Sequence, residues 1–160
     1  GMVRLNVLAL TRLTRAALGV MTERGSGAIV NVGSIAGAIA GPNLAVYAAT
    51  KAYVGLFTES LAEELRGSGV HVQALLPGVT RTGFQEAAGD VGNELPSFLW
   101  QEADAVADAC LAGLRRGRTV VVSGVHNKAF VAAASVLPSS LARRVAGIAS
   151  RARGRDKTVV

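Results

Sequence analysis

Short apolar segments that alternate with helical segments constrain this 160-residue chain most strongly. Residues 28–32, 70–76 and 119–123 are runs of mostly apolar side chains, and strands of this kind suit parallel sheets that are covered on both faces. Apolar residues recur at helical spacing over residues 3–22, 44–66 and 103–116, and the chain from residue 127 onward is mostly helical around Pro138. This alternation predicts an α/β fold with a parallel sheet of about three strands and flanking helices.

The domain organisation follows from the same pattern. Three strands are few for such a sheet, which usually has about five or six. No internal repeat and no linker divides the chain, and residues 79–99 show no clear period and predict a mobile loop with at most one short helix. We assign residues 1–142 to one partial domain and residues 143–160 to a basic C-terminal helix or tail. The first helix begins at residue 2 without a capping residue, which is an unusual way to start a domain.

Charge is concentrated at the C-terminus. The net charge is +6, but residues 143–160 hold six basic residues and one acidic residue, which leaves +1 on residues 1–142. A solvated tail explains this distribution, and a tail that binds an anionic partner is the alternative, with steep salt dependence as its signature. No aromatic residue accompanies these cations to stack on bases, so we expect no nucleic-acid partner.

Several other classes are excluded by single residues. One cysteine, Cys110, rules out an internal disulfide framework, and we expect it to be a small buried residue on a helix. His71 in a strand and His126 in a turn have no ligands at metal spacing, which predicts structural roles and no metal site. Ser34 directly follows its glycine, so the Gly-x-Ser-x-Gly pattern of serine hydrolases is absent. No segment is long and apolar enough to span a bilayer and no signal core is present, which predicts a cytoplasmic protein without a membrane partner.

Three polar residues lie where open α/β sheets bind ligands, beyond the ends of their strands. Ser34 follows the first strand, Tyr47 opens the next helix, and Lys51 lies one turn later on the same helix face. An ammonium group one turn from a phenol favours the phenolate, which would let Tyr47 exchange a proton near neutral pH. Ser34 could then bond the oxygen of a carbonyl or alcohol substrate. A Tyr-x-x-x-Lys pair alone is also common as a surface contact on helices.

The surrounding motifs resemble those of the short-chain dehydrogenase/reductase family. The resemblance rests on Asn31-Val32-Gly33-Ser34, Tyr47-Ala48-Ala49-Thr50-Lys51 and the segment from Leu75 to Thr82. It implies an NAD- or NADP-dependent oxidoreductase in which Tyr47 is the general acid/base and Ser34 orients the substrate oxygen. Lys51 would support Tyr47 and bind the nicotinamide ribose.

The same resemblance implies roles for further residues. Asn6 matches a helix asparagine whose backbone shapes a water relay to the lysine; spacing alone favours an ordinary polar helix position, but its place 28 residues before Ser34 fits the family. The segment that would hold the nicotinamide carboxamide contains Pro77, Gly78, Val79 and Thr82. Residues 98–107, 120–124 and 127–128 are similar to the bacterial subgroup called DltE-like. There Phe84 and Trp100 could line the substrate pocket, with core packing as the alternative for Trp100.

The family's glycine-rich turn after a first strand, which cradles the pyrophosphate, has no counterpart in these 160 residues. The resemblance therefore implies the C-terminal part of a Rossmann-like sheet without its N-terminal nucleotide-binding half. We expect the isolated chain not to be catalytically competent; a subunit of a split reductase, or a non-catalytic oligomeric remnant, are the alternatives. A homo-oligomer is expected, either through the family's usual pair of dimer helices, here residues 3–22 and 44–66, or through the unpaired edge of strand 28–32.

Overall fold

The computed structural model describes residues 1–82, 96–138, 140, 141, 143, 144, 147 and 148. Its main sheet has three parallel strands in the order β1 (Gly27–Val32), β2 (Val70–Leu76) and β5 (Val120–Val122). The register pairs Gly27 with Val70 on one side of β2 and Ala74 with Val120 on the other. The predicted number, position and parallel direction of the strands are confirmed.

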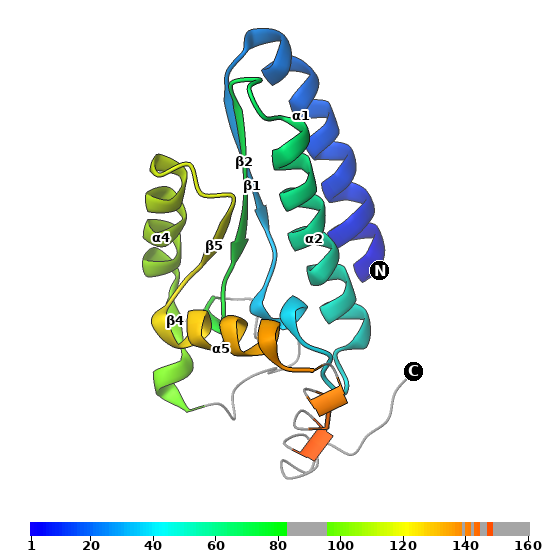
Figure 1. Cartoon of the computed structure of the whole chain (residues 1–160), viewed down its shortest axis with the longest axis vertical. Coiled ribbons are helices and arrows are strands. Elements are labelled where there is room, and N and C mark those ends of the chain that lie inside the picture. Colours follow the sequence, from blue (N-terminus) through cyan, green and yellow to red (C-terminus); the bar gives the residue numbers. More distant parts are fainter. Residues whose placement is uncertain (83–95, 139, 142, 145–146, 149–160) are drawn as a thin grey trace.

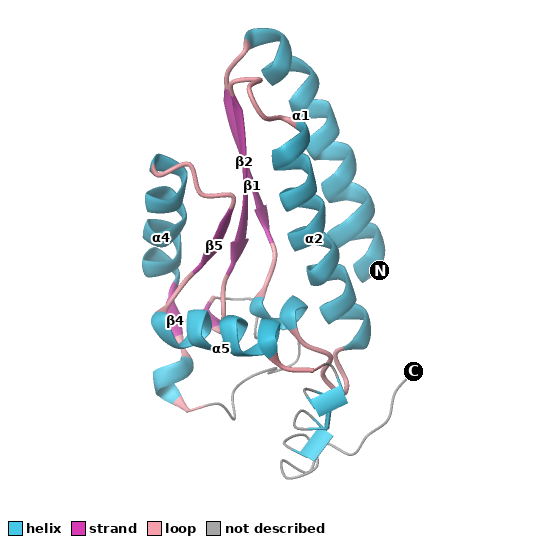
Figure 2. Ribbon diagram, viewed as in Figure 1, coloured by secondary structure: helices cyan, strands magenta, loops and turns pink. Residues whose placement is uncertain are grey.

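Helices cover both sides of this sheet. Helix α1 (Leu10–Arg24) and helix α2 (Ala45–Glu64) lie side by side on one side, and α4 (Ala103–Arg115) lies on the other (Figure 1). Helix α5 (Val125–Val136) crosses the end of the sheet at which β1 and β2 finish, as the strand arrows in Figure 2 show. A π-helical segment, η1 (Arg4–Ala9), precedes α1, which the apolar spacing did not predict.

The core is small and mixed in polarity. One apolar cluster joins β2 and β5 to α4 through Leu75, Val121, Val106 and Cys110, and α2 adds the fully buried Val54 against the sheet. Cys110 is buried on its helix as predicted, and burial raises the pKa of its thiol. That thiol donates to Oε1 of Gln73, which is completely buried in β2. Buried polar groups need such partners, because an unpaired one is costly.

The connection after β2 differs from the predicted loop. Strand β3 (Thr80–Arg81) pairs in parallel with β4 (Gln101–Glu102), and a 3-10 turn, η3 (Ser97–Leu99), comes directly before β4. These two-residue strands are too short to leave a periodic pattern. His126 lies in the first turn of α5, whereas the sequence placed it in a turn between elements.

Large apolar side chains remain exposed on the outer helices. On and before α1, Leu5 and Leu13 are 70% and 71% exposed, and on α2 Leu56 is 71% exposed. Within the described part of the chain, no helix combines the length and apolar character that crossing a membrane requires.

Candidate active site

The segments that follow β1 and β2 are joined by backbone hydrogen bonds. Gly33 donates to the Leu75 carbonyl at 2.8 Å, and Ile35 donates to the Pro77 carbonyl at 3.1 Å. The two strands are parallel neighbours, so their carboxyl ends open at one edge of the sheet. The structure therefore brings the Ser34 segment and the Pro77 segment together, as the sequence predicted.

Ser34 lies at the start of a short 3-10 turn, η2 (Ile35–Ala38), and its Oγ accepts a hydrogen bond from the Ala36 N–H at 3.1 Å. The turn packs closely on α2 at Gly37. A methyl group added there would lie 2.6 Å from the Ala52 nitrogen and 2.7 Å from the Lys51 carbonyl carbon. Only glycine permits this approach, which holds the Ser34 turn against the part of α2 that follows Tyr47.

Tyr47 and Lys51 share one face of α2, as predicted. The Lys51 Nζ lies 5.8 Å from the centre of the Tyr47 ring and donates to the Val32 carbonyl, at the end of β1, at 2.9 Å. Burial lowers the pKa of the Lys51 ammonium from its ordinary value of 10.5. The Tyr47 hydroxyl makes no hydrogen bond to any residue that the structure describes, so it is available to a ligand.

Asn6 belongs to the π-helical segment η1 and contacts the same helix. Its Nδ2 donates to the Thr50 Oγ1 at 3.1 Å, and that hydroxyl in turn donates to the Tyr47 carbonyl at 2.8 Å. Thr50 is 3% exposed and was not singled out by the sequence reasoning, although it lies inside the Tyr47–Lys51 motif. Single π-helical turns in longer helices often occur at functional sites.

The segment from Pro77 to Thr82 runs from β2 into β3. The Thr80 hydroxyl donates to the Gly78 carbonyl at 3.1 Å, and the Gln101 N–H donates to the Val79 carbonyl at 2.9 Å. Thr82 is exposed, and Phe84 lies outside the described residues, so its predicted pocket role is not placed.

Trp100 is half-buried, and the Arg81 guanidinium lies over its ring, 5.5 Å from the ring centre. Arg81 also pairs with Glu102 at 3.0 Å. The indole thus packs against Arg81 of β3, and its predicted place in a substrate pocket stays a prediction.

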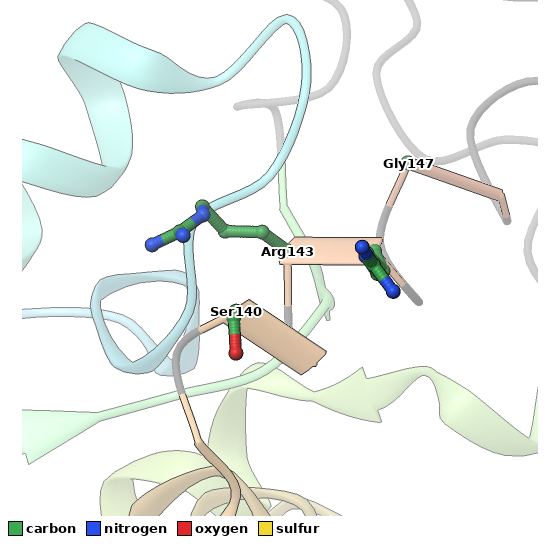
Figure 3. Close-up of a pocket in the computed structure, with 4 residues that line it drawn as sticks. Ser140, Arg143 and Gly147 are labelled. Atoms are coloured by element: carbon green, nitrogen blue, oxygen red, sulfur yellow. The ribbon is translucent and has the colours of Figure 1, made fainter.

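Two cavities have Arg143 in their lining, and one of them lies at the beginning of α2. One of about 560 Å³ is bounded by residues 37–42, by Arg143 and by four alanines of α2, which are Ala45, Ala48, Ala49 and Ala52. The other, about 430 Å³, lies between Ser140, Arg143, Arg144 and Gly147, and in Figure 3 the Arg143 side chain extends from this segment towards the neighbouring cyan ribbon. The α2 alanines occupy a different helix face from Tyr47 and Lys51, so neither cavity is lined by the proposed proton-transfer pair.

The two histidines do not form a metal site in the described part of the chain, where no group of three or more His, Cys, Asp or Glu side chains could hold a metal ion. The His71 Nε2 lies 3.2 Å from the Arg118 carbonyl, which ties β2 to the residues that precede β5. The His126 Nε2 is buried without a hydrogen-bond partner among the described residues.

A parallel α/β sheet with polar residues at the carboxyl ends of its strands defines the Rossmann-like class of fold. Within that class, the family model described as short chain dehydrogenase matches residues 1–91. Because the match covers more than half of the 160 residues, the chain belongs to the short-chain dehydrogenase family, a family of oxidoreductases.

Individual relatives agree with this assignment. The chain is 32% identical over 145 residues to a ketoacyl reductase from Nostoc, covering 86% of this chain and 50% of the relative. It is 42% identical over 76 residues to the very-long-chain 3-oxoacyl-CoA reductase of Rattus norvegicus, covering 48% of this chain and 24% of the relative.

Among solved structures, a short-chain dehydrogenase from Sphingobium yanoikuyae in complex with NADPH superposes with a TM-score of 0.70 at 33% identity. The superposition covers 99% of this chain and 56% of that one. The chain therefore spans about a quarter to a half of the length of these relatives.

Proposed function

We propose that this chain carries the substrate-side half of an NAD(P)-dependent oxidoreductase that interconverts a carbonyl and an alcohol. The observation that carries the proposal is the arrangement around the end of β1, where Lys51 bonds the Val32 carbonyl directly before Gly33 and Ser34. Tyr47 presents its hydroxyl one turn away on the same helix face. These are the groups that proton transfer to a reacting oxygen requires.

In the proposed reaction, Tyr47 donates a proton to the carbonyl oxygen of the substrate in reduction and removes it from the alcohol in oxidation. The Ser34 hydroxyl donates a hydrogen bond that orients the same oxygen. The Lys51 ammonium lies beside the Tyr47 ring, 5.8 Å from its centre, and places a positive charge next to the reacting oxygen. A nicotinamide, when bound, supplies or accepts the hydride.

The residues present fit a nicotinamide ribose in this place. An ammonium group has three N–H donors, and the bond to Val32 uses one of them, which leaves two for ribose hydroxyls. The backbone of Pro77, Gly78 and Val79, with Thr82, would hold the carboxamide. Asn6 would position Tyr47 through Thr50.

The names of the relatives support a substrate class. A ketoacyl reductase and a 3-oxoacyl-CoA reductase act at a ketone in an acyl chain, and a sulfoacetaldehyde reductase from Chromohalobacter salexigens, 41% identical over 97 residues, is named for an aldehyde. We therefore assign a ketone or aldehyde substrate, with NADPH as the cofactor to test first because of the Sphingobium complex. The DltE-like subgroup remains part of this proposal.

The 160 residues contain no Gly-x-Gly-x-x-Gly turn of the kind that cradles a pyrophosphate between a strand and a following helix, so we expect the dinucleotide affinity of this chain to be low. Clear micromolar binding of NADPH or NADH in a titration would overturn that expectation.

The test of the catalytic roles compares the two tyrosines of the sequence. Replacing Tyr47 by Phe removes only the hydroxyl and should lower ketone-dependent NADPH oxidation, measured at millimolar NADPH, by about 100-fold or more. Tyr53→Phe is the matched control, because the Tyr53 hydroxyl bonds to Thr11 at 2.7 Å and faces away from the proposed chemistry. Turnover that survives Tyr47→Phe would contradict the proposed role, and absence of any wild-type turnover would favour the non-catalytic oligomer.

A further inference from the structure

Three polar side chains meet beside the backbone from Gly78 to Thr80, although they are distant from it in sequence. They are Gln101, Ser123 and Asn127. The Gln101 Oε1 accepts hydrogen bonds from the Ser123 Oγ at 2.8 Å and from the Asn127 Nδ2 at 2.9 Å. The Asn127 Nδ2 also donates to the Ser123 carbonyl at 2.8 Å. Ser123 and Asn127 are 1% and 4% exposed, so this cluster is part of the interior.

The hydrogen bonds fix the orientation of the Asn127 amide. An asparagine NH₂ group has two donors, and both are used, one by Gln101 and one by the Ser123 backbone. The amide plane therefore has no freedom to rotate without breaking a buried bond. A buried polar network that is fully satisfied holds its members in one arrangement.

Gly78 packs directly on this fixed amide. A methyl group added to Gly78 would overlap the Asn127 side chain, with the Cγ at 2.7 Å. The same segment is also held by the backbone of Gln101. The Gln101 N–H donates to the Val79 carbonyl, and Gln101 is the partner of Thr80 in the pairing of β3 with β4. Gln101 therefore bonds the backbone from Gly78 to Thr80 with its own backbone, and it fixes the Asn127 amide with its side chain.

We propose that Asn127 and Gln101 are positioning residues that set the path of the backbone from Gly78 to Thr80. This rests on the proposed function in one respect, namely that this backbone holds the nicotinamide carboxamide. The cluster links it to β5 and α5, which lie about fifty residues later in the chain. Displacement of a binding group by about 1 Å is enough to cost about 100-fold in rate, which explains why a rigid support would be built there.

The first test removes the two donors while keeping the shape. Asn127→Asp places a carboxylate oxygen against two acceptors, so the cluster should open. We expect hydrogen exchange at the Gln101 amide, which bonds Val79, to rise at least tenfold, while the paired amides of β1 and β2 keep their protection. Lys128→Ala, at the exposed neighbouring position on α5, is the control and should change neither.

The second test uses the steric contact. Gly78→Ala alone should raise exchange at Gln101 in the same way, because its methyl group displaces the Asn127 amide. In the double variant Gly78→Ala with Asn127→Ala, that methyl group enters the space the amide has left. Exchange at Gln101 should therefore be slower in the double variant than in Gly78→Ala alone or in Asn127→Ala alone. Equal or additive increases in the double variant would overturn the proposal, as would an Asn127→Asp protein that retains wild-type protection at Gln101.

The cofactor readout separates this proposal from the proposed function. NADPH affinity, measured by fluorescence titration, should fall about tenfold or more in Asn127→Asp and recover in the double variant. Exchange changes without any change in NADPH affinity would support the positioning of the backbone and contradict the placement of the carboxamide. The exchange experiment needs no cofactor, so it decides the positioning role even if the chain binds none.

Discussion

Lys51 combines two opposing effects at the residue scale. Partial burial removes water from its ammonium group and lowers the pKa of that group, while the Val32 carbonyl accepts a hydrogen bond from it at 2.9 Å. The charge is therefore held at some cost in stability, beside the ring of Tyr47. Strained or desolvated charges of this kind are concentrated at functional sites, which agrees with the proposed role.

The lowered pKa of Lys51 predicts the direction in which stability changes with pH, and that direction can be measured. Between the folded pKa and 10.5 the unfolded chain binds more protons at Lys51 than the folded chain, so stability rises with pH in that window. We expect the wild type to gain stability relative to Lys51→Met as the pH increases from 8 towards 10.5, in urea unfolding of both proteins. Lys128→Met provides the reference for loss of one lysine charge. Parallel pH curves for wild type and Lys51→Met would show that Lys51 is not desolvated.

At the scale of elements, the site depends on how closely η2 approaches α2. Gly37→Ala should lower the free energy of unfolding by about 1–3 kcal/mol, because the added methyl group meets backbone atoms of Lys51 and Ala52 that cannot rotate away. Urea unfolding measures the change. Gly19→Ala on α1 is the matched control, since nothing lies within 4 Å of the new methyl group, and it should stabilise by about 0.5–1 kcal/mol. A Gly37→Ala protein as stable as the wild type would contradict the close approach.

The elements themselves were largely predictable from the sequence, because β1, β2 and β5 are short apolar runs and α2 and α4 have helical spacing. The buried polar contacts were not. Asn31 accepts from Thr14 at 3.2 Å and donates to Thr58 at 3.0 Å, joining β1 to α1 and α2, yet each residue alone is an ordinary polar position. Pairwise spacing reveals Tyr47 and Lys51 because they share a helix.

Spacing cannot reveal the cluster of Gln101, Ser123 and Asn127, because these residues meet only through the fold. The one available signal was the resemblance of residues 120–124 and 127–128 to a subgroup pattern, which marked the positions without indicating their contacts. The pairing of β3 with β4 was missed for the related reason that two residues show no period.

At the scale of the whole molecule, the outer face of η1, α1 and α2 exposes large apolar side chains that include Leu5, Leu13 and Leu56. We expect homo-oligomers in which this face is covered, as the sequence resemblance implied, because large exposed apolar patches mark association surfaces. Light scattering should give at least twice the 16.4 kDa chain mass.

Leu5→Lys with Leu13→Lys should shift the protein to monomers, whereas Leu111→Lys on α4, across the sheet, should not. A monodisperse wild-type monomer would contradict the expectation. An oligomer that both lysine variants retain would point to pairing along the free edge of β1 instead.

The parallel register also determines the order in which this sheet can form. Gly27 pairs with Val70, and Ala74 pairs with Val120. Each pairing therefore closes a loop of more than forty residues before any strand contact is gained. Such non-local pairing slows folding relative to helical proteins of the same size. During synthesis β1, α2 and β2 leave the ribosome in that order, and β5 follows only later, so β2 keeps an unpaired edge for a period in which the central strand is open to misassociation.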